Sequence, residues 1–179
     1  MDDIVQQAMA KWPNVPDCYG WLGLDNRGNW YMRDDRAQAL GAFDSGQPGA
    51  KGSLLQHEKL IDFIGRNYSA DALGHWFFQN GPQRVYVELQ AAPLVWRVQV
   101  DHSVKDHIGR SAQIHGCWLD ELGHLFLAAD TGFGLVHTQD METAADAVER
   151  GLWVPQAVLS QDLPGRFGFV RSPHLLHIK

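Results

Sequence analysis

A short turn motif constrains the fold of this chain more than any other feature of its sequence. The pattern Asp-x-x-Gly-x, followed by three apolar residues, occurs at residues 25–32, 71–78 and 120–127. An Asp side chain accepts hydrogen bonds from backbone N–H groups two or three residues later, and Gly adopts the positive φ that ends such a turn. Each copy therefore predicts a turn that leads into a strand. A fourth copy at residues 162–169 keeps the turn residues but interrupts the apolar run with Gly168.

The number and spacing of these motifs favour an internal duplication. With 16 Asp and 18 Gly in 179 residues, roughly 1.6 matches to Asp-x-x-Gly are expected by chance, whereas the sequence has seven. The turns at Asp25 and Asp120 are 95 positions apart, and those at Asp71 and Asp162 are 91 apart. We therefore expect a duplicated turn-strand, helix, turn-strand unit, with independent β-turns as the alternative. The remaining matches lack the full apolar run and begin at Asp17, Asp62 and Asp106.

The pattern of apolar residues predicts an α+β fold of mostly antiparallel strands in hairpins, with three short helices. The helices are expected at residues 2–12, at 53–67 after a capping box that begins with Ser53, and at 140–150 with Asp140 as its cap. Asn80-Gly81 predicts a type I′ hairpin turn. Further short strands are expected at residues 154–159 and 167–170, and the tail at 174–178 is expected to be an edge strand.

Residues 101–116 suggest how the chain is divided. This segment is polar and contains three histidines, so it is interpreted as a connector between an N-terminal α+β lobe at residues 1–100 and a C-terminal α+β lobe at 117–179. The alternative is that both lobes pack as one compact domain.

Composition excludes several classes of partner. The net charge is −6 and no cluster of Lys or Arg is present, so we expect no nucleic-acid partner. The chain begins with an acidic segment, and no apolar run approaches the roughly 18 residues of a membrane span, so we expect neither a signal peptide nor a membrane partner. Two cysteines, Cys18 and Cys117, make no disulfide framework, so a reduced cytoplasmic protein is expected.

Two families of unknown function resemble parts of the sequence. Residues 1–96, which include Trp12-Pro13-Asn14-Val15-Pro16, Tyr19-Gly20-Trp21 and Asn80-Gly81-Pro82-Gln83-Arg84-Val85-Tyr86-Val87, resemble a small uncharacterised proteobacterial family. The Asp-x-x-Gly-x-Trp turn, the helix after it, and Val87-Glu88 followed by Ala92-Pro93-Leu94 resemble a second uncharacterised bacterial family. That second resemblance implies repeated α+β motifs and a signalling role. Neither resemblance implies a catalytic residue.

A search for catalytic and metal-binding motifs leaves no candidate. Among nine histidines, the closest pairings with other metal ligands are His115 with Cys117 and His174 with His177, and neither has the spacing of a zinc signature. The sequence has no nucleophile elbow, P-loop, dinucleotide fingerprint or calcium loop. We therefore predict no catalytic residue, no metal and no cofactor.

Seven tryptophans suggest a binding surface, because Trp is rarely buried completely. We expect at least one Trp to border an exposed concave patch with arginine or tyrosine nearby, which would suit an anionic or aromatic ligand. Trp21 is a further candidate, with core packing as the alternative. The candidate ligand-binding residues are Trp30, Arg33, Trp76, Arg84, Tyr86, Trp96 and Arg97.

Two classes of function follow from these observations. The first is a cytoplasmic binding or regulatory module, with a role in signalling, that recognises a protein or a small ligand; a homodimer would use the same residue types. The alternative is a hydrolase or isomerase whose site is assembled from scattered residues such as Arg97, Asp101, His102 and His107.

Overall fold

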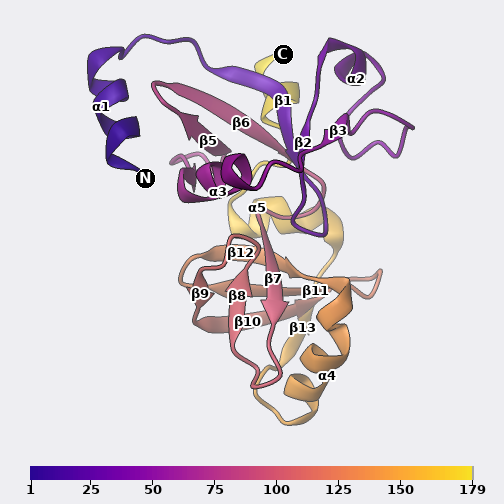
Figure 1. The fold of residues 1–179 in the computed structure, drawn as a ribbon. Coiled ribbons are helices and arrows are strands. Elements are labelled where there is room, and N and C mark those ends of the chain that lie inside the picture. Colours follow the sequence, from indigo (N-terminus) through magenta and orange to yellow (C-terminus); the bar gives the residue numbers. More distant parts are fainter. Residues whose placement is uncertain (179) are drawn as a thin grey trace. The chain divides into compact units, whose positions relative to one another are not determined.

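A computed structural model describes the structure of residues 1–178 (Figure 1). Its contacts form two compact units, each of which is described by itself. Unit 1 contains residues 1–25, residues 29–90 and the C-terminal segment from Phe169, and unit 2 contains residues 26–28 and 91–168. Among the described residues, every helix is too short or too polar to cross a lipid bilayer.

Unit 1 is a six-stranded mixed sheet with helices on both faces. The strand order is β3-β2-β1-β6-β5-β4, in which β1 and β6 are parallel and the other neighbours are antiparallel. Its core includes Leu24, Trp30, Ile64, Val87 and Leu89. The elements of unit 1 are α1 (Asp3–Lys11), β1 (Cys18–Leu24), β2 (Trp30–Met32), α2 (Asp35–Ala39), β3 (Ser53–Leu54), α3 (Glu58–Arg66), β4 (Tyr68–Ala70), β5 (Trp76–Asn80), β6 (Gln83–Leu89) and α6 (Pro173–His177).

Unit 2 is a seven-stranded mixed sheet of order β13-β10-β11-β12-β7-β8-β9, with parallel pairs β12/β7 and β10/β13. Leu94, Trp96, Phe126, Leu127 and Leu163 are fully buried in it. The elements of unit 2 are β7 (Leu94–Val98), β8 (Val104–Asp106), β9 (Ser111–Ala112), β10 (Ile114–Leu119), β11 (Leu125–Ala129), β12 (Gly132–Val136), η1 (Thr138–Asp140), α4 (Met141–Glu149), β13 (Pro155–Ala157), η2 (Ser160–Asp162) and α5 (Leu163–Phe167).

The two sheets have the same strand order. The order β3-β2-β1-β6-β5-β4 recurs as β9-β8-β7-β12-β11-β10, and each corresponding pair of strands has the same parallel or antiparallel sense. In this correspondence the Asp71 turn between β4 and β5 matches the Asp120 turn between β10 and β11. The pairing of Asp25 with Asp120, from which the duplicated unit was predicted, does not follow this order.

Three of the predicted Asp-x-x-Gly turns are confirmed. Asp71 and Asp120 each accept N–H groups two and four residues later on Oδ1, and they bind the imidazole of His75 or His124 through Oδ2. Asp25 accepts from the N–H and the amide of Asn29. The glycines at positions 28, 74 and 123 have φ of 81°, 82° and 83°. The motif thus closes a turn through contacts within five residues.

Among the weaker matches to the motif, Asp106 forms the turn and Asp162 does not. Asp106 forms the same turn, with Gly109 at φ 87° and with Arg110 supplying the partner for the carboxylate. Asp162 precedes helix α5, and Gly165 lies inside that helix. The predicted turn at Asp162 is therefore wrong. Pro164 explains the difference, because proline is favoured in the first turn of a helix, where its missing N–H is not needed.

Other local predictions also need correction. The β5/β6 hairpin is confirmed, but Asn80 pairs with Gln83, so its loop is Gly81-Pro82, with glycine at φ 57° in the first position, as in a type II′ turn. Ser53 does not cap α3, because it pairs with β2, and the cap is His57, whose ring accepts from Leu60 N–H. The tail forms helix α6 in place of a strand, and α2 and α5 were not predicted.

The division into units also differs from the expected boundaries. Strand β7 lies before residue 101 but belongs to the sheet of unit 2, and the segment from Phe169 belongs to unit 1. Residues 101–116, expected to be a connector, contain β8 and β9 and the beginning of β10. A short polar hairpin therefore looks like a linker in sequence because its strands contribute few apolar residues.

Candidate functional site

The tryptophans proposed as ligand contacts are core residues. Trp30 and Trp96 are fully buried, and Trp76 is 9% exposed. Trp30 packs edge-on against Tyr68, and the Trp96 indole donates to the Leu127 carbonyl at 2.9 Å. Their surroundings match the alternative of core packing, and their role in ligand binding stays a prediction.

The arginines and the tyrosine of the candidate set are engaged in structural contacts. Arg33 is buried and donates to the carbonyl oxygens of Ala50, Gly20 and Gly41, which holds the glycine-rich loop after α2. Arg97 forms two hydrogen bonds with the carboxylate of Asp140, at 2.6 and 3.1 Å. Asp140 therefore precedes α4 but does not cap it with its side chain. The other two stack on rings: Arg84 on Phe77, and Tyr86 on Tyr19.

The scattered residues of the enzyme alternative have separate partners. His102 Nε2 lies 2.7 Å from Asp146, Asp101 accepts from Ser103, and the Nδ1 of His107 accepts from Val95 N–H. Asp101 and His102 border one open groove, which neither Arg97 nor His107 lines. No group of three or more metal-binding side chains occurs within residues 1–178.

Unit 1 contains an apolar pocket between its sheet and α3. The pocket has a volume of about 290 Å³. Its lining comes from five elements: Cys18, Trp21 and Leu22 of β1, Met32 of β2, Leu60 and Ile64 of α3, Phe78 and Asn80 of β5, and Val85 of β6.

Strand register brings these side chains to one face. Cys18 and Phe78 are both register partners of Val85, and Leu22 pairs with Met32. Directly paired residues point to the same side of a sheet, so these rows form a continuous apolar floor. Sequence analysis missed this site, because the register of β1 against β6 joins segments about 65 residues apart in the chain.

The mouth of the pocket has exposed apolar side chains. Trp21 is 39% exposed, Met32 45% and Leu60 37%. An irregularity between Cys18 and Leu22 breaks the pairing of β1 with β6, and Gly20 lies there with φ of 82°. A bulge of this kind changes the alternation of side chains, which lets both Trp21 and Leu22 line the pocket.

The pocket has a single ionisable side chain, the Cys18 thiol. Its lining includes no carboxylate, imidazole, amine, guanidinium or hydroxyl group, and its other polar groups are the Asn80 amide and the Trp21 indole N–H. Burial raises the pKa of the Cys18 thiol above its usual value, so the thiol is neutral at pH 7. Such a lining suits an apolar group and presents no charged side chain to it.

Comparisons with known proteins identify a family for this chain but no ligand. A family model described as "Protein of unknown function (DUF2946)" matches residues 1–174, which confirms the predicted resemblance to a family of unknown function over a longer stretch than residues 1–96. A crystal structure of a DUF1285 family protein from Silicibacter pomeroyi DSS-3 is similar with a TM-score of 0.48 and 12% identity, over 82% of this chain and 84% of that chain. No curated protein matches this chain.

Proposed function

The chain belongs to the DUF2946 family of proteins of unknown function, and we propose that it is a binding module that takes a small apolar ligand in the pocket of unit 1. The observation that carries this proposal is the lining of the pocket, which is apolar on every side and has Asn80 as a single amide for orientation. Ligand sites are typically concave, mostly apolar and provided with few polar groups.

The size of the pocket limits the ligand. An apolar cavity of about 150 Å³ is enough for benzene. A pocket of about 290 Å³ therefore has room for a group larger than one six-membered ring, such as an indole or a medium-length acyl chain. The exposed side chains of Trp21 and Met32 would lose contact with water when such a ligand binds, and this burial supplies the driving force.

This lining has the neutral Cys18 thiol as its one ionisable side chain, which favours binding over catalysis. A hydrolase or isomerase needs a group that accepts or donates a proton at the bound substrate. The alternative enzyme would therefore have to use another surface, such as the open groove beside Asp101 and His102.

Methyl NMR of methionine provides a direct test. The chain has four methionines, of which Met32 alone lines the pocket, so Met9 and Met141 serve as internal controls. Titration with indole and with 1-octanol should shift the Met32 methyl signal in a saturable manner and leave the two controls in place.

A blocking variant makes the test specific. Leu60→Trp should fill the mouth of the pocket and weaken binding at least tenfold. Leu54→Trp is the matched control, because Leu54 is also exposed but pairs with Tyr31 and does not line the pocket. Equal binding to the wild type and Leu60→Trp, or equal shifts of all the methionine signals, would contradict the proposal.

A further inference from the structure

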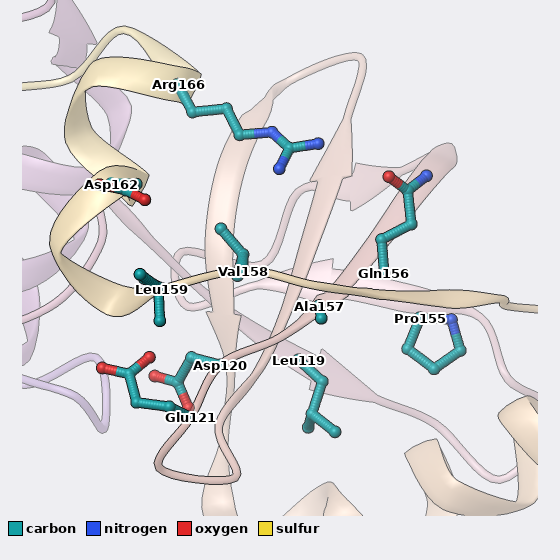
Figure 2. Close-up of a pocket in the computed structure, with 10 residues that line it drawn as sticks. All are labelled: Leu119, Asp120, Glu121, Pro155, Gln156, Ala157, Val158, Leu159, Asp162 and Arg166. Carbon is teal, nitrogen blue, oxygen red and sulfur yellow. The ribbon is translucent and has the colours of Figure 1, made fainter.

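A second surface lies along the outer edge of the sheet in unit 2. Strand β13 is the first strand in the sheet order, and a groove of about 650 Å³ runs beside it (Figure 2). Gln156 and Ala157 are exposed, and exposed apolar side chains of Leu119, Val154 and Leu159 flank the strand. An exposed edge bordered by apolar side chains is a site where another strand can pair.

The outward hydrogen-bonding groups of this edge follow from its pairing with β10. The N–H of Val158 donates to the Leu119 carbonyl at 3.1 Å, so Val158 and Gln156 direct their backbone groups toward β10. Residues alternate along a strand, and Pro155, Ala157 and Leu159 therefore direct theirs outward.

The outward backbone groups of one β13 strand can pair with those of a second β13 strand. In an antiparallel pair of two β13 strands centred on Ala157, the two copies of Ala157 exchange two hydrogen bonds, and Pro155 lies opposite Leu159 of the other copy. Pro155 has no N–H, and the carbonyl of Leu159 already accepts from Asp162 N–H at 3.0 Å. The Leu159 carbonyl therefore does not need an N–H from Pro155 of the other copy. The Leu159 N–H can donate to the Pro155 carbonyl of that copy.

The charges along the groove are also arranged for a two-fold pair. At the Leu159 end, Glu121 accepts from Ser160 N–H and Oγ, and Asp162 lies in the following turn. Nearer to the middle of the strand, the Arg166 guanidinium lies 5.8 Å from the Trp118 ring, and Trp118 is the register partner of Gln156.

Figure 2 shows the carboxylates of Glu121 and Asp162 on one side of the groove and the Arg166 guanidinium nearer to Gln156. Arg166 has no ion pair within the part of the chain that the structure describes. An antiparallel copy would bring its acidic end toward this guanidinium, and two-fold symmetry would repeat the same contact with the roles of the two copies exchanged.

We infer that strand β13 pairs with β13 of a second copy of this chain, which makes one continuous sheet across a two-fold axis at Ala157. The occupant of the groove is thus the same edge of a second molecule. This inference is independent of the pocket in unit 1, since it uses residues of unit 2 alone.

Sedimentation velocity on the full chain tests the inference. The mass should rise with concentration from 20.1 kDa toward twice that value. Ala157→Pro removes the N–H donor that each copy supplies at the centre of the pair. Because this N–H points away from β10, the variant should stay monomeric and should melt at the temperature that the wild type shows at a concentration where it is dissociated.

Charge reversal provides a second test that does not alter the backbone. Arg166→Asp and Asp162→Arg should each weaken the dimer by roughly tenfold, because like charges then face each other, and the double reversal should restore it. Glu149→Arg is the control, since it makes the same charge change as Asp162→Arg on the exposed end of α4.

The inference would be overturned by a monomer at every concentration, by a dimer that persists in Ala157→Pro, or by a double reversal that binds no more tightly than the single ones. A dimer that dissociates equally in Glu149→Arg would show a general charge effect and would also contradict it.

Discussion

Ser172 Oγ donates a hydrogen bond of 2.5 Å to the carboxylate of Glu88, although the two residues are 84 positions apart. The N–H of His174 donates to the other carboxylate oxygen at 3.1 Å, and Leu89 N–H binds the Arg171 carbonyl. These bonds attach the C-terminal segment to β6. Because Glu88 is buried, they also provide donors for a charge that would otherwise be costly.

Substitution of Ser172 should loosen this segment. Ser172→Ala removes a donor to a buried carboxylate and the cap of α6, which accepts from Leu175 N–H. We expect a loss of about 2 kcal/mol in the free energy of unfolding, measured by urea denaturation, together with faster amide exchange in α6. Ser160→Ala is the control, because Ser160 also donates to a carboxylate, that of Glu121, but at an exposed site. Unchanged exchange in α6 would show that another contact holds the segment.

Glu88 should make stability depend on pH. Burial raises the pKa of its carboxyl group above the ordinary value, despite hydrogen bonds from Ser172 and His174 and the charge of Arg33. The native state then binds a proton more readily than the unfolded state. The contribution of Glu88 to stability therefore falls as the pH rises from the unfolded pKa, about 4.3, through the native pKa.

Comparison of the wild type with Glu88→Gln isolates this effect. The variant lacks the titrating group and does not lose this contribution. Its free energy of unfolding should therefore rise relative to that of the wild type as the pH increases through this range. Urea denaturation from pH 4 to pH 8 measures the difference. A difference that does not change with pH would mean that the native pKa of Glu88 is not raised.

The glycines of the turns should resist substitution. Gly123 has φ of 83° and open space around it, so Gly123→Ala introduces backbone strain without a clash and should cost about 1 kcal/mol. Gly165→Ala is the matched control, because Gly165 lies in a helix with equally open space and alanine favours helices. Thermal melts should show the first variant destabilised and the second unchanged or stabilised. Equal melts would refute the role of positive φ in the turn.

The two cysteines should differ in reactivity. Cys18 borders the pocket and is partly exposed, whereas Cys117 is buried and burial raises its pKa to about 11. Iodoacetamide at pH 8 should modify Cys18 first, as mass spectrometry of the intact protein and its peptides would show. Saturating indole should slow this reaction if the pocket is occupied. Modification of both thiols at the same rate would indicate that the fold opens on that timescale.

The candidate sites were less predictable than the secondary structure. Residue type alone favoured Trp30, Trp96 and Arg33, but all three are buried. The pocket instead uses Trp21 and Met32, whose exposure depends on a bulge in β1 and on the register of β2. Two partial signals were present: Trp21 was a further candidate for a ligand surface, and the helical spacing of Leu60 and Ile64 placed both on one face of α3.

The sequence by itself determined the turns at Asp25, Asp71 and Asp120, because each closes through hydrogen bonds within five residues. It also determined the β5/β6 hairpin, whose two-residue loop leaves little freedom. Only the tertiary structure decided the parallel pairings of β1 with β6 and of β12 with β7, the return of the C-terminal segment to unit 1, and the exposed edge at β13. These features join residues far apart in the chain, where loop closure and burial over the whole unit, and not the preferences of neighbouring residues, set the free energy.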